Sequence, residues 1–168
     1  VLILKEILNP EPQKVLILFD TGATSKSSVE QVFRGKNSTI IDGVQTDLKL
    51  IGNINVWKKT VMTAKDSGYD AIIVGLYHTI TDDYGDHVDS GEILEWTSRN
   101  TPVPPFCFWD FTAGADKAIG GLVLFGKIQG QTAGRLALDI LSGTKPYDIH
   151  PVVAEKGRLL FSKKQIEK

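Results

Sequence analysis

Short apolar runs recur along the chain and are separated by polar or glycine-containing turns. The runs at 15–19, 70–76 and 103–108 are apolar on both faces, which is typical of buried strands in a parallel sheet. The runs at 38–44 and 118–125 predict two more strands, the second of which contains a glycine pair. The pattern therefore predicts a sheet whose central strands are covered on both sides.

Segments with apolar residues at helical spacing lie between these runs. Ser27 and Glu30 have the spacing of a capping box, so we expect a helix to begin near Ser27. Further helices are expected over 55–67, 90–99 and 126–141. Strands that alternate with helices predict parallel βαβ units. The expected fold class is therefore α/β, with a Rossmann-like, doubly wound and mainly parallel sheet.

Composition narrows the classes of function. With 168 residues, 42% of them hydrophobic and 23% charged, the chain has the make-up of one globular domain. The net charge of -1 offers nothing to attract nucleic acid or an anionic membrane, so we expect no nucleic-acid partner. The three His are scattered and Cys107 is the single cysteine, so we expect no metal, no disulfide framework and no cofactor.

The start of the sequence lacks both an initiator Met and the cationic region of a signal peptide. We therefore expect a fragment of a longer protein whose targeting signal lies outside this sequence.

Candidate binding residues follow from the predicted sheet, because ligands of such sheets bind where the strands end at their carboxyl side. The segments at these positions are 20–25, 76–79 and 109–112. Tyr77 and Trp109, with a few polar neighbours, have the composition of a small-molecule pocket. His78 has the chemistry of a general base, but the sequence places no nucleophile beside it.

The segment 18–23 also matches the aspartic-protease signature, a hydrophobic pair followed by Asp-Thr-Gly-Ala. That chemistry needs a second carboxylate, for which Asp89 is the candidate. The match is local, because those proteases are all-β and a helix is expected here. A hydrolase that uses Asp20 is therefore an alternative function. A flavodoxin-like domain that binds FMN phosphate with 21–25 is another, and an ordinary strand-to-helix turn explains the same residues.

The last third of the sequence resembles a known family. The segments 118–121, 130–137 and 140–149 are similar to the C-terminal part of ABC-type solute-binding proteins, including the pattern Ile-Leu-x-Gly-x-x-Pro-x-x-Ile. Similar periplasmic sensor domains occur in histidine kinases. Upstream, 70–74 and 101–106 fit the order of strands in that family, so the resemblance covers most of the chain.

The resemblance implies one lobe of a type I periplasmic-binding-protein fold, in which two lobes close on a small molecule. Residues 1–168 would form a single α/β ligand-binding lobe, with 118–168 packing on a missing N-terminal lobe or on a partner chain in a homodimer. The protein would be bacterial, periplasmic or extracytoplasmic, and not an enzyme. It would serve a membrane permease or a kinase module.

The resemblance also implies which residues contact the ligand. They lie after the first, third and fourth buried strands and are Asp20, Thr21, Thr24, Tyr77, His78, Trp109 and Asp110. Tyr77 and Trp109 would stack on the ligand, and the polar side chains would hydrogen-bond to it. Two aspartates would favour a cationic or hydroxyl-rich ligand.

Overall fold

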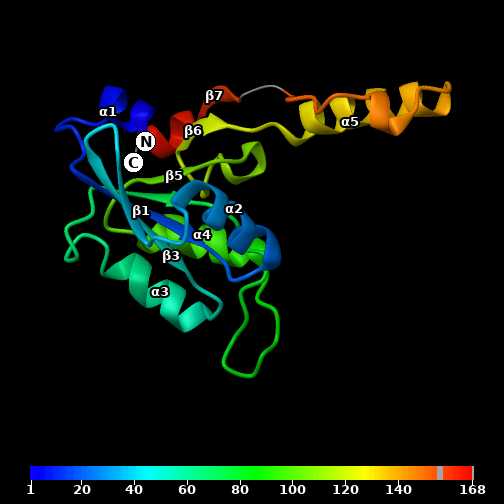
Figure 1. The fold of residues 1–168 in the computed structure, drawn as a ribbon. Helices are drawn as coiled ribbons and strands as arrows, with labels where there is room; N and C mark the ends of the chain where they lie inside the picture. The colour runs from blue at the N-terminus through cyan, green and yellow to red at the C-terminus, as the bar shows by residue number, and fades with distance from the viewer. Residues whose placement is uncertain (155–156, 168) are drawn as a thin grey trace.

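A five-stranded sheet forms the centre of the molecule (Figure 1). The computed structural model describes residues 1–154 and 157–167. The strands of this sheet are β1 (Lys14–Phe19), β2 (Ser38–Ile41), β3 (Val44–Leu50), β4 (Ala71–Val74) and β5 (Pro105–Cys107). Their order is β2-β3-β1-β4-β5, and every pairing is parallel except that of β2 with β3. The predicted fold class, α/β with a mainly parallel sheet, is confirmed.

Helices cover both faces of the sheet. They are α1 (Leu2–Ile7), α2 (Ala23–Phe33), α3 (Ile54–Met62) and α4 (Ser90–Asn100). On one face, α3 and α4 pack on β1 and β4 around Trp57, which is fully buried and donates a 2.8 Å hydrogen bond from Nε1 to Thr97 Oγ1. On the other face, Leu4 of α1 and Phe33 of α2 close a second core. The sheet is therefore buried between two layers, as its apolar strands predicted.

Several bounds differ from the sequence prediction; α3, for example, was expected over 55–67 but ends at Met62. Residues 38–44 do not form one strand; they form β2 and a tight turn at Asp42 and Gly43, both with positive φ (53° and 81°), that leads into β3. The strand β3 was not predicted. The helix expected to begin at Ser27 begins one turn earlier, at Ala23, so Ser27 lies inside α2 and caps nothing.

Beyond the five-stranded sheet and its covering helices, which we call the body of the molecule, the described chain forms a second, two-stranded sheet and a projecting segment. β6 (Gly120–Val123) and β7 (Arg158–Phe161) form an antiparallel pair, and α6 (Lys163–Ile166) follows β7. Between the two strands lie α5 (Gly126–Leu141) and a short 3-10 helix at Pro146–Asp148. We call residues 126–148 the arm. α5 has the predicted bounds, but none of its residues is buried, and Figure 1 shows it projecting away from the sheet.

Among the described residues, no helix combines the length and the apolar character that a membrane-spanning helix needs.

Candidate functional site

Asp20 stands where β1 ends and α2 begins, and its carboxylate ties this turn to the segment after β4. Oδ1 accepts hydrogen bonds from the Ser25 hydroxyl (2.5 Å) and the Gly22 amide (3.1 Å). Oδ2 accepts one from the Thr79 amide (3.0 Å), 59 residues along the chain. The side chain is only 2% exposed, so its oxygens serve the protein's own backbone and hydroxyl groups.

These bonds also set the protonation of Asp20. Burial by itself raises the pKa of a carboxyl group, but the hydrogen bonds from Ser25, Thr79 and Gly22 favour the charged form and bring the pKa of Asp20 below its ordinary value. Asp89, the candidate second carboxylate of a protease, caps α4 instead, where Oδ1 accepts from the Glu92 amide (3.0 Å). The arrangement around Asp20 is that of an ionised turn-forming residue rather than one of two carboxylates that share a proton.

Four aromatic side chains gather at the same edge of the sheet; we call them the aromatic platform. Tyr77 stacks on His78 with ring centroids 4.6 Å apart, and His78 meets the edge of Phe111 at 5.8 Å. Phe111 in turn stacks on Trp109 at 6.3 Å. The residues come from the segments that follow β4 and β5, which are adjacent parallel strands. The structure thus brings together the aromatic side chains of two strand ends that the sequence analysis selected.

The platform has a buried base and an open surface. Tyr77 is buried, and that burial raises the pKa of its hydroxyl, with a further contribution from the nearby Cys107 thiol. His78 is exposed, and Phe111 is 48% exposed. The indole N–H of Trp109 is buried and has no hydrogen-bond partner in the described part of the chain. A buried N–H without an acceptor costs about 1–3 kcal/mol, so this indole needs a structural explanation.

The other predicted contact residues lie at this edge but outside the platform. Thr21 and Thr24 are exposed on the turn before and at the start of α2. Thr21 lies against the turn after β3: a β-carbon on Gly52 would come within 2.7 Å of its Oγ1. Asp110 is half-buried, and its Oδ1 accepts a 3.0 Å hydrogen bond from the Phe111 amide.

Ser25 and Thr79 lie in the predicted segments 20–25 and 76–79 but were not among the predicted contact residues, and both hold the Asp20 carboxylate. The hydroxyl-rich sequence after Asp20 is a signal for Ser25, whereas the sequence carries no local signal for Thr79. No group of His, Cys, Asp and Glu that could hold a metal ion occurs within residues 1–154 and 157–167.

Comparisons with known proteins find one informative likeness. No protein-family model matches the sequence, and no curated protein matches it. The solved ligand-free, open structure of CD0873, a substrate binding protein with adhesive properties from Clostridium difficile, has a similar fold, with 16% identity and a TM-score of 0.57. The similarity covers 99% of this chain, the arm included, and 52% of that chain. This chain therefore has the fold of about half of a substrate-binding protein.

Proposed function

We propose that this chain is one lobe of a solute-binding protein and that the aromatic platform is its half of the ligand site. The observation that carries the proposal is the position of the platform. Tyr77, His78, Trp109 and Phe111 lie at the carboxyl edge of a parallel sheet, where such folds bind ligands, within a fold shared with a substrate-binding protein. The protein would act outside the cytoplasm of a bacterium, either for ABC-type uptake or as the sensory domain of a signalling protein.

The side chains of the edge favour a ligand with a planar ring and a cationic or hydroxyl group. The exposed rings of His78 and Phe111 offer stacking surfaces. Asp110 adds a carboxylate beside them, and only one of its oxygens accepts a hydrogen bond from the described residues. The unpaired N–H of Trp109 would be satisfied if the ring turned toward an acceptor on the ligand or on a second lobe. Thr21 and Thr24 are further contacts, and Asp20 orders the turn that carries them.

The second lobe is expected to pack on the arm. Gly126, Gly130 and Gly134 repeat every four residues and therefore share one face of α5, together with Ala137 and Leu141. A β-carbon at any of the three glycines would meet no atom within 4 Å. Glycine destabilises a helix interior by about 1 kcal/mol relative to alanine, and isolated helices of this length are marginal. A face of small and apolar residues on a projecting helix is thus suited to the close approach of another element.

A ligand titration tests the proposed site. We would follow amide and side-chain NMR signals of the chain with benzylamine, which has a ring and a cation, and with benzoate as its matched anion. Benzylamine should shift the signals of His78, Trp109 and Phe111 and bind more tightly than benzoate. Asp110→Asn should reduce that preference. Equal affinity for both compounds, or no shift at these residues while other surfaces respond, would contradict the proposed site.

Sedimentation of the 168-residue chain tests the partner of the arm. We expect a monomer in which the α5 amides exchange freely with solvent, because the second lobe that would cover them is not on this chain. A stable dimer with protected α5 amides would instead assign this face to a second copy and contradict the two-lobe proposal.

A further inference from the structure

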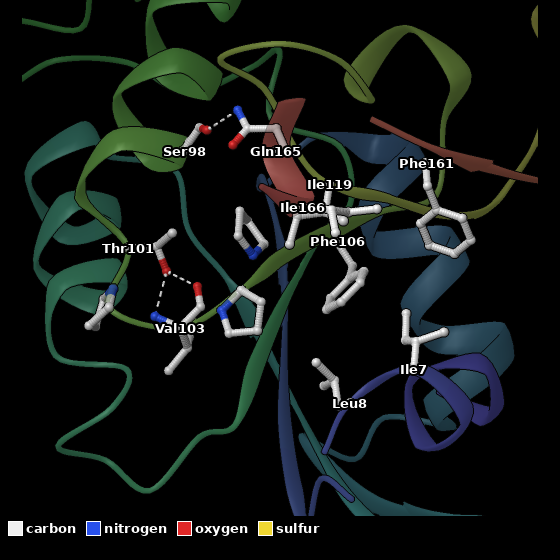
Figure 2. A pocket seen from close by; sticks show the side chains of 13 residues that line it. Ile7, Leu8, Ser98, Thr101, Val103, Phe106, Ile119, Phe161, Gln165 and Ile166 are labelled. Carbon is white, nitrogen blue, oxygen red and sulfur yellow. Dashed lines mark hydrogen bonds between the residues drawn. The ribbon is translucent and has the colours of Figure 1, made fainter. Parts of the chain in front are cut away.

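A cavity of about 570 Å³ lies at the amino edge of the sheet, the opposite edge from the aromatic platform (Figure 2). Its walls come from the end of α1, the end of α4, the segment that leads into β5, and α6. Most of the lining is apolar, and it includes Pro102, Pro105, Phe106, Ile119 and Phe161. No charged side chain of residues 1–154 and 157–167 lines it. The volume is that of a small-molecule site, and the lining would disfavour an ion.

Two polar side chains stand side by side in this apolar surrounding. Gln165 is only 7% exposed, and its Nε2 donates a 3.0 Å hydrogen bond to Ser98 Oγ. Figure 2 shows the nitrogen of this amide joined to Ser98 by a dashed line and its oxygen below that nitrogen, on the side of the other residues that line the cavity. Neither that oxygen nor the hydroxyl hydrogen of Ser98 has a hydrogen-bond partner in the described part of the chain. The cavity thus offers one free acceptor and one free donor next to each other.

The third polar residue of the lining does not compete for this role. The Thr101 hydroxyl donates to the Val103 carbonyl (2.7 Å) and accepts from the Val103 amide (3.3 Å), so both of its functions are used within its own turn. Among the described side chains of the lining, only those of Ser98 and Gln165 therefore have free hydrogen-bonding capacity.

We propose that this cavity binds a neutral, mainly apolar molecule that carries one hydroxyl group. A hydroxyl is both a donor and an acceptor, so a single group can donate to Gln165 Oε1 and accept from the Ser98 hydroxyl, while the rest of the molecule packs on the prolines and Phe106. Gln165 belongs to α6 and Ser98 to α4. The bound molecule therefore connects the segment that returns from the arm with the body of the lobe. This site is separate from the proposed solute site and does not depend on it.

The test is an NMR titration of the chain with three probes that share a benzene ring and differ in the attached group: benzyl alcohol, toluene and benzoate. Benzyl alcohol should shift the signals of Ser98, Phe106 and Gln165 and should bind about tenfold more tightly than toluene, because toluene leaves the polar pair unpaired. Benzoate should bind weakest, since its charge would be desolvated without a partner. Signals of His78 and Phe111 report separately on the aromatic platform.

Two variants identify the groups responsible. Gln165→Leu replaces the polar side chain with an apolar one of similar size and should abolish the preference for benzyl alcohol over toluene. Ser98→Ala should reduce this preference. Ser28→Ala, on α2 and away from the cavity, is the matched control and should change nothing. The inference is overturned if toluene binds as tightly as benzyl alcohol to the unaltered chain, if the preference survives in Gln165→Leu, or if no signal of the cavity shifts at saturating concentrations.

Discussion

The body of the molecule and its arm differ in how far their apolar side chains are buried. In the body, β1 and β4 are covered on both faces, and Trp57 of α3 and Ile93 and Leu94 of α4 are buried against them. In the arm, the 16 residues of α5 include no buried residue, and Leu138 and Leu141 are 65% and 83% exposed. Both regions have helical periodicity and apolar side chains, so the sequence pattern alone does not separate them. The difference lies in whether a neighbour covers the apolar face.

This contrast teaches where the stability of the chain resides. Apolar burial is the main favourable term in folding, and the body has two clusters of it. The arm gains almost none within this chain and consists of a helix with three glycines on one face. We therefore expect the body to determine the free energy of unfolding and the arm to respond mainly to whatever packs on it.

The largest effect is expected in the core. Trp57→Ala removes a fully buried indole and its hydrogen bond to Thr97, so the free energy of unfolding should fall by about 3–5 kcal/mol. Leu138→Ala on the arm is the control and should change it by less than about 0.5 kcal/mol. Urea unfolding followed by circular dichroism measures both. Comparable losses for the two variants would show that the arm is part of the folded core.

The junction of body and arm should show the next largest effect. Gly120 has φ +130°, and a β-carbon there would lie 1.9 Å from the Leu160 carbonyl oxygen. Gly120→Ala should therefore break the β6–β7 pair at a cost of about 2–3 kcal/mol. Hydrogen exchange should accelerate at Leu122 and Leu160 but not in β1. Gly143→Ala, with positive φ and open space around it, is the control and should leave that exchange unchanged.

A third effect comes from the carboxyl edge and depends on pH. Asp20→Asn replaces a charged carboxylate that accepts three hydrogen bonds with a neutral amide. The free energy of unfolding at pH 7 should therefore fall by about 1–2 kcal/mol. The native pKa of Asp20 lies below its ordinary value of 3.8, so its stabilisation is complete above that value and is lost as the pH falls through the native pKa.

Urea midpoints measured from pH 7 to pH 3 check this. The difference between the original chain and Asp20→Asn should shrink as the pH approaches the native pKa. Asp110→Asn, whose carboxylate bonds only to the next amide among the described residues, should show a smaller difference at every pH. A constant difference for Asp20→Asn would show that its charge is not what holds the turn.

The parts of the fold that the sequence could predict are those with a complete local pattern. Continuous apolar residues in β1 and β4 and a glycine stop after α5 were sufficient for these elements. The strand β3 was missed because its positions alternate between buried and exposed and include the charged residues Asp47 and Lys49. The Asp42-Gly43 pair before it is typical of a hairpin turn and could have indicated the strand. The capping-box spacing of Ser27 and Glu30 gave the wrong first residue for α2, because the same residue types also occur inside helices.

From the sequence, the site could be predicted only where the rule applies that neighbouring parallel strands end at the same edge of the sheet. That rule correctly placed Tyr77 and Trp109 at one edge. It could not place Thr79 on the Asp20 carboxylate, since this bond joins residues 59 apart and depends on the path of a loop. Nor could it find the cavity lined by Ser98 and Gln165, because these two residues are 67 positions apart in the sequence.

The smallest effect is also the one that separates the two regions most cleanly. Gly130→Ala adds a β-carbon where nothing lies within 4 Å, so in the 168-residue chain it should stabilise α5 by about 1 kcal/mol and increase its helical circular dichroism. Gln131→Ala, one position along and on another face, should give a gain of less than half that size. In a body helix the same change would meet packed neighbours and be unfavourable. When a second lobe or a second copy covers the arm, Gly130→Ala should become destabilising, because the added methyl group would hold the two backbones apart. A gain that persists unchanged in the assembled protein would show that the glycine face of α5 is not where the partner packs.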